Sequence, residues 1–384
     1  MFRLNKKLMW LFCLPVLLFV LISGCAKEKK VYKIGAIFAI TGPASPLGTP
    51  ERDTVKLLED QINQAGGIDG HRLKVIIYDT AGDETKCRMA VKKLIYKDKV
   101  LAIIGPSRSG TTLAIIDEVQ KAEIPLISCA ASIKIVEPVK KWVFKTPQSD
   151  VLAVAKIIDY LKERNIDKIA IINVSNPYGI SGKEQLDIQA PQAGIQVVAH
   201  EEFGQKDPDM TAQLTRIKGT DAQAVICWGT NPGPAIVARN MRQLGMQIPL
   251  IQSHGIANKK FIELAGEAAE GVVFPAGRLI VAEELPDSDP QKSLLLKYAN
   301  DFQQKYGRSA DTFGGHAWDA LQLVVSALKK AGPDKAKIRD EIENTRNFIG
   351  TGGIFNFSPT EHNGLTKEAF VMVTIRDGNW RLLK

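Results

Sequence analysis

The chain of 384 residues has few cysteines and few aromatic residues: it contains five cysteines, and Phe, Trp and Tyr make up 7% of it. No Cys-X-X-Cys pair occurs, and neither the cysteines nor the five histidines have the spacing of metal ligands. No block of five or six like charges is present, and aromatic residues do not interleave with basic runs. These absences argue against a metal site and against a nucleic-acid partner.

The chain has a single long apolar run, which lies at the N-terminus. Residues 8–22 carry no charge, follow a basic start, and lead into Ser23-Gly24-Cys25. A run of 15 residues, from 8 to 22, is too short to cross a hydrocarbon core of about 30 Å comfortably. A basic start, a short apolar centre and small residues at the end predict a secretory signal over residues 1–24. An uncleaved membrane anchor is the alternative.

The residues that end this run resemble the lipobox of bacterial lipoproteins. The resemblance implies that the signal is removed before Cys25, that the Cys25 sulfur carries lipid, and that residues 25–30 form a tether beside the membrane. The remaining chain then lies outside the cytoplasm, on the periplasmic or cell-surface side of a bacterial membrane. Because ATP and NAD are not supplied there, we expect no cofactor, and most enzyme classes are disfavoured.

Removal of the signal leaves 384 − 24 = 360 residues, which is more than one hydrophobic core usually holds, so two domains are expected. Three cysteines remain for the folded part: Cys87, Cys129 and Cys227. An odd number leaves at least one free thiol, and whether two of them form a disulfide stays open at this point.

Short apolar strands alternate with amphipathic helices from residue 32 to about residue 252. Such strands, separated by helices, predict parallel sheets that are covered on both faces. The polar segment 145–150 interrupts the series and predicts a crossing between two sheets. The expected strands are Tyr32–Phe38, Leu73–Tyr78, Val100–Gly105, Pro125–Ser128, Lys168–Asn173, Gln196–Phe203, Ala222–Trp228 and Pro249–Gln252.

The pattern changes after residue 252. Helical spacing dominates from about residue 290 to residue 344, as in the stripe formed by Trp318, Leu321 and Val325. At the end of the chain, Asp377-Gly378-Asn379 separates the apolar runs 369–376 and 380–382. Asp-Gly between apolar runs predicts an antiparallel hairpin.

Two loops rich in small and hydroxyl-bearing residues follow the third and fourth predicted strands. The first spans residues 105–112 and leads into a helix predicted over Leu113–Lys121, and the second spans residues 127–132. Parallel strands bring both loops to one sheet edge, where open α/β sheets bind ligands. Unpaired N–H groups at a helix N-terminus favour an anion, and hydroxyls add directed donors. A capped helix without a ligand is the alternative.

The first loop lacks the residues that would assign it to nucleotide binding or to hydrolysis. A P-loop requires a lysine after GxxxxG, and Thr111 stands at that position. A nucleophile elbow requires GxSxG, and Ser109 stands where the last glycine belongs. The sequence therefore favours a cradle for one carboxylate, built mainly from uncharged donors.

An ordered set of short motifs resembles the leucine/isoleucine/valine-binding proteins of ABC importers. The set covers essentially the whole chain after the signal, and its motifs are Ile34-Gly35-Ala36, Thr41-Gly42-Pro43, 63–70 (Asn-Gln-Ala-Gly-Gly-Ile-Asp-Gly), Ile104-Gly105-Pro106, Ala130-Ala131-Ser132, Pro177-Tyr178-Gly179 and 266–271 (Gly-Glu-Ala-Ala-Glu-Gly).

The resemblance implies an α/β fold of two doubly wound parallel-sheet lobes joined by three hinge crossings, the type I periplasmic-binding-protein fold. On that template the crossings fall near Thr146, Pro275 and Phe355. Lobe one then holds residues 31–146 and 276–354, and lobe two holds residues 147–275 and 355–384.

The resemblance also implies which residues contact a ligand. Ser109 matches a serine that binds the α-carboxylate of an amino acid, and Ala130 and Ser132 match contacts made by the next loop. Tyr178 matches an aromatic residue that lobe two brings onto the ligand. His254 stands where amino-acid binders have a glutamate that pairs with the α-ammonium. A histidine at neutral pH does not supply that full negative charge.

Four further positions are possible ligand contacts. Asn231 stands at a contact position that is usually aromatic, and Arg108 replaces the cysteine of a cleft-side disulfide. An arginine there can form a fork with a carboxylate. Phe313 begins a helix that can form a wall of the cleft, together with His316, and Ser107 lies in the first loop. Trp228, at a strand end, is as well explained by the core as by a ligand platform.

Two ligand classes remain open. An amino acid fits if another acid, such as Asp319, approaches the ammonium. An aromatic or other non-amino carboxylate fits as well or better, because His254 and Asn231 can then hydrogen-bond a ring hydroxyl.

We therefore expect a monomeric solute-binding lipoprotein of a branched-chain-amino-acid-type ABC importer, not an enzyme, that captures a small carboxylate by cleft closure and presents it to the permease. The expected ligand is an amino acid, and an aromatic or other non-amino carboxylate is the alternative. A ligand sensor with the same fold is one alternative. The other is a secreted serine hydrolase that uses Ser107 or Ser109 with His254, although it lacks the elbow glycine and a recognisable acid.

Overall fold

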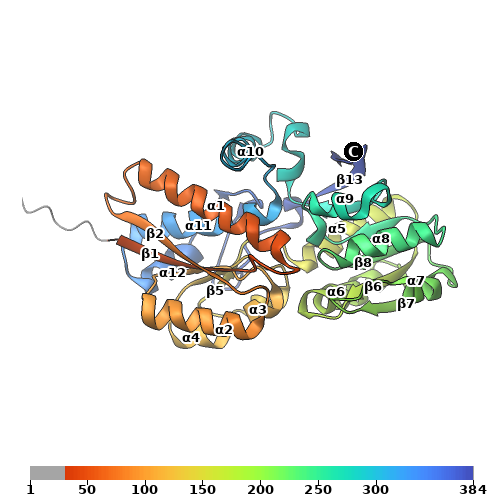
Figure 1. The fold of residues 1–384 in the computed structure, drawn as a ribbon, viewed down its shortest axis with the longest axis horizontal. Helices are drawn as coiled ribbons and strands as arrows, with labels where there is room; N and C mark the ends of the chain where they lie inside the picture. Colours follow the sequence, from red (N-terminus) through yellow and green to blue (C-terminus); the bar gives the residue numbers. More distant parts are fainter. Residues whose placement is uncertain (1–30, 384) are drawn as a thin grey trace, which may run out of the picture.

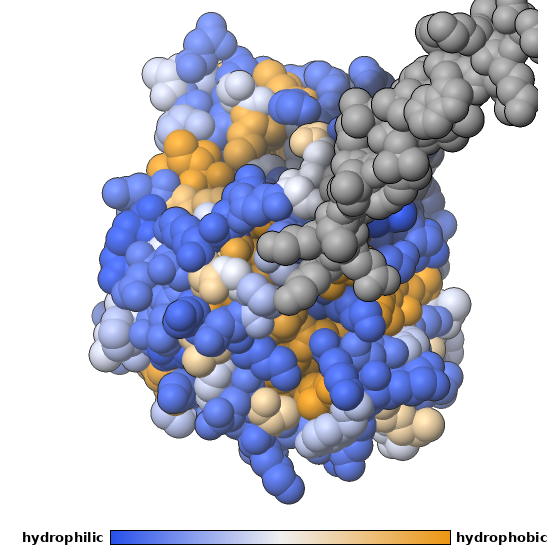
Figure 2. All heavy atoms as spheres, turned by 90° about the vertical axis from the view of Figure 1, so that its left-hand side faces the viewer, coloured by the Kyte–Doolittle hydropathy of each residue, from blue (hydrophilic) through white to orange (hydrophobic). Residues whose placement is uncertain are grey.

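The computed structural model describes residues 31–383, which form two α/β lobes lying side by side (Figure 1). The predicted signal peptide, Cys25 and the tether lie outside the described residues. Seen from the end of lobe one, the surface is mainly hydrophilic, with small apolar areas between polar side chains (Figure 2).

Lobe one is built on a five-stranded parallel sheet with the strand order β2-β1-β3-β4-β5. Apolar side chains on both faces of the sheet are buried, because helices cover each face. The strands are β1 (Val31–Phe38), β2 (Arg72–Asp79), β3 (Ile103–Ile104), β4 (Leu126–Ser128) and β5 (Val143–Lys145).

The two faces of this sheet carry different helices. One face packs against α1 (Ser45–Gln64), α11 (Thr312–Ala331) and α12 (Lys335–Glu343), and the other against α2 (Glu84–Lys92), the π-helix Lys93–Asp98 and α4 (Ile116–Lys121). Helix α10 (Lys292–Tyr306) lies outside this layer and buries Leu295 and Phe302 against Leu57 of α1.

Lobe two is built on a seven-stranded sheet with the strand order β14-β13-β10-β9-β8-β6-β7. Helices α5 (Asp150–Glu163) and α6 (Pro177–Gln192) cover one face, and α7 (Thr211–Lys218), α8 (Gly233–Gln243) and α9 (Lys260–Ala265) cover the other. The parallel strands are β6 (Lys168–Val174), β7 (Gln196–Phe203), β8 (Ala224–Trp228), β9 (Leu250–Gln252) and β10 (Val273–Ala276).

The predicted C-terminal hairpin forms the antiparallel edge of this sheet. Strands β13 (Val371–Arg376) and β14 (Asn379–Leu382) pair from Arg376 opposite Asn379, so two residues make the turn. Both of them, Asp377 and Gly378, have positive φ, of 52° and 65°. A two-residue hairpin turn of type I′ requires positive φ at both central residues, which Asp-Gly adopts readily. The Asp-Gly pair therefore predicted the hairpin correctly.

Three crossings join the lobes, and the third differs from the sequence expectation. The first follows β5, and the second follows β10. The third was expected near Phe355, but Phe355 and Phe357 stack in the core of lobe one, with ring centroids 5.6 Å apart. The core of lobe two begins only at Phe370, so the chain crosses between Ala369 and Phe370. The packing of these aromatic rings keeps the segment with lobe one. The short sequence motifs carried no information about this packing.

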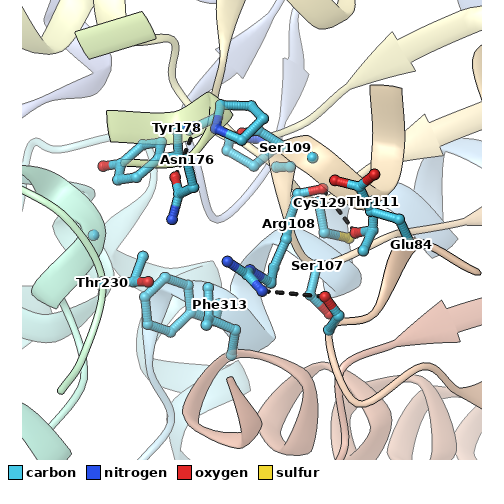
Figure 3. Close-up of a pocket in the computed structure, with 18 of the residues that line it drawn as sticks. Glu84, Ser107, Arg108, Ser109, Thr111, Cys129, Asn176, Tyr178, Thr230 and Phe313 are labelled. Atoms are coloured by element: carbon cyan, nitrogen blue, oxygen red, sulfur yellow. Dashed lines mark hydrogen bonds between the residues drawn. The ribbon is translucent and has the colours of Figure 1, made fainter. Parts of the chain in front are cut away.

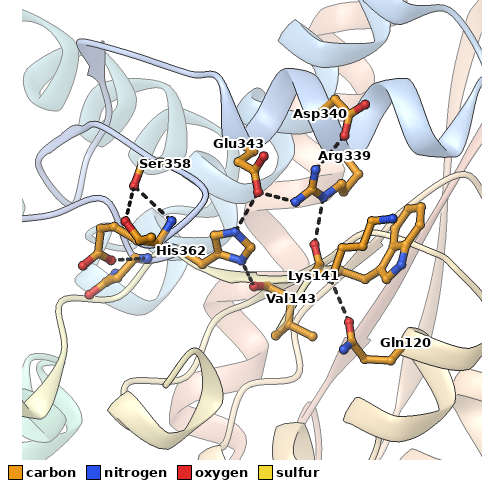
Figure 4. Close-up of polar contacts among 12 residues, drawn as sticks. Gln120, Lys141, Val143, Arg339, Asp340, Glu343, Ser358 and His362 are labelled. Carbon is orange, nitrogen blue, oxygen red and sulfur yellow. Dashed lines mark hydrogen bonds and ion pairs between the residues drawn. The ribbon is translucent and has the colours of Figure 1, made fainter. Parts of the chain in front are cut away.

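Polar contacts hold the same segment against lobe one (Figure 4). The ring nitrogens of His362 lie 2.8 Å from the carbonyl oxygen of Val143 and 3.2 Å from a carboxylate oxygen of Glu343. Arg339 of α12 contacts the same carboxylate and donates from Nε to the Lys141 carbonyl at 2.9 Å. The short hairpin of β11 (Phe348–Ile349) and β12 (Ile354–Phe355) precedes this segment.

The helix after the first hydroxyl-rich loop also differs from the prediction. It begins at Ser109, not at Leu113, and it is broken into α3 (Ser109–Leu113) and α4 (Ile116–Lys121). The earlier start follows from the hydroxyl-rich sequence itself, since Thr111 and Thr112 both donate to the carbonyl oxygen of Arg108, at 2.9 and 3.0 Å. The remaining single-turn helices are Ile133–Ile135, His254–Ile256, Gly266–Ala269 and Lys367–Ala369, and a longer 3₁₀ segment spans Arg278–Glu284.

Cys87, Cys129 and Cys227 are all buried and free, which answers the open question about a disulfide among them. Within residues 31–383, no group of histidine, cysteine and acidic side chains is arranged to hold a metal ion. No helix in that range combines the length and the apolarity needed to cross a bilayer.

Candidate functional site

A cavity of about 400 Å³ lies between the two lobes, a volume suited to a small molecule. Figure 3 shows residues of lobe two, such as Tyr178 and Thr230, on one side of it and residues of lobe one, such as Glu84 and Thr111, on the other. Loops at the carboxyl ends of strands in both sheets supply most of its wall, as expected for open α/β sheets.

Ser109 lies in the lobe-one wall at the start of α3. Its Oγ accepts a hydrogen bond of 3.3 Å from the backbone N–H of Ser132, and the hydroxyl proton is therefore available to a ligand. The first N–H groups of α3 have no acceptor within the helix, which adds donors at the same place. Gly105 makes the preceding turn with φ of 87°, where a Cβ atom would lie 2.3 Å from the Ile37 carbonyl oxygen.

Ser107 also lines the cavity, but its hydroxyl is engaged on the protein side. Its Oγ accepts the N–H of Ala39 at 3.0 Å and donates to the carboxyl group of Glu51. Glu51 is fully buried in α1, and this burial raises its pKa well above the ordinary range. Ser107 therefore shapes the loop and has no proton left to donate to a ligand.

Arg108 is the cation of the cavity wall. Its Nη1 donates to the carbonyl oxygen of Gly82 at 3.1 Å. Burial lowers the pKa of Arg108, and the nearby Glu84 carboxylate partly offsets this. An arginine starts from so high a pKa that it stays charged, and its remaining N–H groups can bind a carboxylate bidentately.

The second loop contributes Ala130 and its neighbours to the wall, but not Ser132. The Ser132 hydroxyl accepts the N–H of Lys134 at 3.3 Å and donates to the Ser181 hydroxyl of α6 at 2.8 Å. Ser181 in turn donates to the buried carboxylate of Asp150. Ser132 thus joins the lobes through a chain of hydrogen bonds instead of projecting into the cavity.

Tyr178 and His254 form the lobe-two wall. Tyr178 is the second residue of α6, where the Asn176 side chain caps the helix by accepting the N–H groups of Tyr178 and Gly179. Its phenol donates to Ser253 at 3.1 Å, and burial raises its pKa, so it stays un-ionised. Tyr178 therefore offers mainly its ring to a ligand.

His254 follows β9 and is enclosed by aromatic rings. Its ring centroid lies 5.7 Å from Tyr178, 6.0 Å from Trp228 and 5.4 Å from Phe370, in edge-to-face contacts. Burial lowers its pKa to about 3, and His316 and Lys145 add to the effect. His254 is therefore neutral at physiological pH and provides no negative charge for an ammonium group.

Besides Ser132, three further residues considered from the sequence lie outside the lining. Asn231 is buried next to Thr230, and Thr230 is the residue that faces the cavity. Trp228 is a core residue, packed so closely against α6 that a Cβ on Gly182 would lie 2.1 Å from its ring. Asp319 accepts hydrogen bonds from the backbone of Thr351 and Gly352 in lobe one, so it does not reach a ligand.

Sequence reasoning missed other lining residues in loops that follow strands. Asp83 and Glu84 follow β2, Gln205 follows β7, and Thr230 follows β8. The rule that ligands bind beyond the carboxyl ends of parallel strands was sufficient to suggest these loops. Phe313 and His316 of α11 complete the wall from lobe one.

The arrangement does not provide an activated nucleophile. The Ser107 hydroxyl is bonded to Glu51, Ser109 accepts a backbone N–H, and neither nitrogen of His254 has a hydrogen-bond partner. A serine hydrolase requires a hydrogen bond between nucleophile and base, which is absent between these residues.

Comparison with known proteins agrees with the geometry. Residues 31–379 match the family described as periplasmic binding protein. A leucine-, isoleucine-, valine-, threonine- and alanine-binding protein of Pseudomonas aeruginosa is 26% identical over 325 residues, 84% of each chain.

Two solved structures illustrate the similarity of fold. An extracellular ligand-binding receptor from Rhodopseudomonas palustris HaA2 has 29% identity and a TM-score of 0.87, covering 92% of this chain and 99% of that one. The branched-chain amino acid transporter substrate-binding protein LivJ of Streptococcus pneumoniae, in complex with isoleucine, has 26% identity and a TM-score of 0.82, covering 92% and 100%. The chain therefore belongs to the periplasmic binding proteins, within the leucine/isoleucine/valine-binding family, and its two-lobed fold is the one predicted.

Proposed function

We propose that this protein is the extracytoplasmic receptor of an ABC importer and that it binds a small carboxylate that lacks an α-ammonium group. It acts as a monomer, tethered to the membrane by lipid on Cys25, and delivers the ligand to a permease. Family membership supports the receptor role, and the composition of the cavity wall supports the ligand class.

The charge of the cavity wall is the observation that carries the ligand assignment. Arg108 and Ser109 provide a cation and a hydroxyl donor for a carboxylate. At the position where family members pair an ammonium with glutamate, this chain has the neutral His254. The acids that line the cavity are Asp83 and Glu84, and both are exposed, so water screens them. The wall thus favours an anion over a zwitterion.

Branched-chain amino acids are the second candidate, because several relatives carry names that refer to them. An amino acid would have to place its ammonium near Glu84 at the rim. Solvent would weaken that contact. The Glu84 carboxylate also stabilises the charged form of Arg108, and pairing with the ammonium would draw it away from that role.

Closure of the lobes accounts for capture. Ser132 contacts Ser181 across the lobes, Lys134 donates to Glu184 at 2.7 Å, and Thr312 donates to the Ala257 carbonyl at 3.4 Å. We infer that lobe one holds the ligand first and that lobe two then closes over it, since the cation Arg108 and the hydroxyl donor Ser109 lie in lobe one.

Isothermal titration with matched acids tests the ligand class. Leucine and 4-methylpentanoate differ only in the amino group, as do phenylalanine and 3-phenylpropanoate, and benzoate adds a compact aromatic acid. We expect the acids without the amino group to bind at least about tenfold more tightly than their amino partners. Tighter binding of leucine would replace the first candidate with the second, and no binding by any carboxylate would refute both.

Membrane attachment is tested separately by replacing Cys25→Ser in cells. The protein should then move from the membrane fraction to the soluble extracytoplasmic fraction. Unchanged membrane association would contradict lipid attachment at Cys25.

A further inference from the structure

Basic side chains gather at the end of lobe one that is remote from the cavity. The parallel strands of lobe one run toward the cavity, so the loops that lead into them lie at the opposite end. Helices α1 and α11 line the cavity with Leu47 and Phe313 of their first turns, and they therefore end on the same remote side. We call this surface the end face, and it consists of residues 31–33, 65–72, 97–101, 121–125, 141–142 and 329–337.

The end face is strongly positive. Ten basic and four acidic residues lie on it, which gives a formal net charge of +6. Nine of the ten basic side chains are exposed, and Lys335 is half-buried. Within residues 31–383, only Lys330 among the ten forms an ion pair, 3.3 Å from Glu341, so nine of the charges have no acidic partner in that range. The basic residues are Lys33, Arg72, Lys97, Lys99, Lys121, Lys141, Lys329, Lys330, Lys335 and Lys337, and the acidic residues are Asp69, Asp98, Glu123 and Asp334.

This charge is specific to one end of the molecule. The whole chain carries +8, and three of these charges belong to the predicted signal, so residues 25–384 carry +5, which is less than the end face alone. The segments that lead into the parallel strands of lobe two contain six basic and five acidic residues, and four of the six basic residues form ion pairs. These segments are 162–168, 192–196, 216–224, 242–250 and 266–273, and the paired residues are Arg164, Lys168, Arg216 and Arg242.

The expected lipid attachment lies close to the end face in the sequence. Val31, the first residue of β1, belongs to the end face and comes six positions after Cys25. A chain of six residues spans at most about 20 Å. Figure 1 shows β1 beginning at the end of the molecule away from lobe two, and Figure 2, which looks onto that end, shows a mainly hydrophilic surface. Lipid on Cys25 would therefore hold the end face within about 20 Å of the membrane.

Resting on the lipid attachment in the proposed function, we propose that the end face binds the membrane surface through anionic phospholipid head groups. The cavity lies at the other ends of the same strands, so this contact leaves it uncovered. Lobe two then stands farthest from the bilayer, because it lies at the opposite end of the long axis (Figure 1).

The form of the end face suits a lipid surface better than other partners. Lysines near an anionic bilayer are attracted to it over a Debye length of about 8 Å, and mobile head groups can gather beneath scattered charges without a fixed pocket. A protein partner usually meets an apolar centre, whereas Val31 is the one large hydrophobic side chain exposed on the end face. A soluble polyanion would meet the same charges, but the tether places only the bilayer permanently beside them.

Sedimentation with lipid vesicles tests the end face without the anchor. The mature polypeptide without its lipid, residues 26–384, is mixed with vesicles of phosphatidylcholine alone or of phosphatidylcholine with about one third phosphatidylglycerol. At low ionic strength, the anionic vesicles should bind at least about fivefold more protein than the neutral ones. Sodium chloride at about 0.5 M should abolish the difference, because it shortens the Debye length.

A triple variant of the end face locates the binding surface. Lys97→Gln, Lys329→Gln and Lys337→Gln together remove three exposed charges that have no ion-pair partner among the described residues. Binding of this variant to the anionic vesicles at low ionic strength should be at least about fivefold weaker than that of the unsubstituted protein.

A second triple variant has the same net charge and an intact end face. Lys162→Gln, Lys206→Gln and Lys218→Gln together remove three exposed charges from lobe two. Its binding to the anionic vesicles should stay within about twofold of that of the unsubstituted protein. Circular dichroism and thermal unfolding establish that both variants are folded.

The outcomes separate this proposal from the proposed function. Equal binding to neutral and anionic vesicles, or an equal loss in the two triple variants, would overturn the end face as a membrane-binding surface. Binding to heparin without binding to anionic vesicles would overturn it in favour of a soluble polyanion. None of these measurements involves the ligand or Cys25, so their failure would leave the receptor role and the lipid attachment to their own tests.

Discussion

The two walls of the cleft differ in the charge of the side chains that line them. The lobe-one wall contains the donors and the cation, at Ser109 and Arg108, and these groups are positioned by hydrogen bonds within lobe one. The described lining residues of lobe two are uncharged: Tyr178 and His254 contribute rings that pack against the buried Trp228, and Gln205 and Thr230 contribute neutral polar groups. The difference suggests a division of labour in which lobe one recognises charge and lobe two contributes shape and excludes water.

The physical basis of this difference is the cost of leaving polar groups unpaired. Lobe one offers donors that water can satisfy while the cleft is open. In lobe two the Tyr178 hydroxyl is already bonded to Ser253, so its ring can be covered by a ligand without stranding the phenol. His254 is the exception, which is why its substitution is informative.

Removing the cation of lobe one should have the largest effect. In Arg108→Met we expect affinity for the best-binding carboxylate to fall by roughly 30- to 100-fold, since hydrogen bonds to charged groups are worth about 1.5–3 kcal/mol. Titration calorimetry measures the change. Arg108→Lys keeps the charge but loses the fork and should fall in between. Arg72→Met, in which an exposed arginine at the start of β2 is replaced, serves as the control. An unaltered affinity in Arg108→Met would show that Arg108 does not bind the carboxylate of the ligand.

His254 should make the protein less stable in acid. The buried ring stays neutral down to its pKa of about 3, whereas the unfolded ring takes up a proton below about pH 6.5. The unfolded state therefore binds more protons in this window, and the free energy of unfolding falls as the pH falls. One such group contributes a loss of about 2 kcal/mol between pH 6.5 and pH 5.

Replacement by leucine removes this contribution. Between pH 7.5 and pH 5, the free energy of unfolding of His254→Leu should therefore decrease by about 2 kcal/mol less than that of the wild-type protein. Asp311, Asp319 and His316 are present in both proteins, so their own titrations cancel in the difference. Urea unfolding at several pH values measures it, with His200→Leu as the exposed control. Parallel curves for the wild type and His254→Leu would mean that the ring is not held neutral.

Loss of the lobe-one hydroxyl should have a moderate effect. In Ser109→Ala we expect about a tenfold loss of affinity, because one uncharged hydrogen bond to the ligand is removed. Ser107→Ala is a matched control in the same loop, since that hydroxyl is directed at Glu51 and not at a ligand. If both variants bound equally well by titration, the assignment of Ser109 as the donor would be wrong.

The smallest effect should come from the phenol of lobe two. Tyr178→Phe keeps the ring and removes only the hydroxyl, which contacts Ser253. We expect affinity to change by less than about threefold, whereas Tyr178→Ala should lose much more because it removes the ring. A large loss in Tyr178→Phe would show that lobe two also contributes a polar contact, and the contrast between the walls would weaken.

Local sequence signals predicted much of this molecule. The hairpin follows from Asp377-Gly378, because the turn depends on two residues alone. The strands and helices of both lobes follow from apolar spacing, and the motif order indicated the family. The loops around Ser109 and Ala130 were placed at one sheet edge from strand order, and the structure does bring them into one cavity with Tyr178 and His254.

Local patterns therefore sufficed to predict the parallel-sheet lobes and the loops that reach the cleft, since periodicity and turn chemistry act over a few residues. Long-range packing was needed to establish that residues 355–369 stay with lobe one, that Ser132 bonds to Ser181, and that Thr230 rather than Asn231 faces the cavity. Each of these depends on contacts between residues far apart in the chain. Local sequence patterns are compatible with several such arrangements, and packing together with the pairing of buried polar groups determines which one forms.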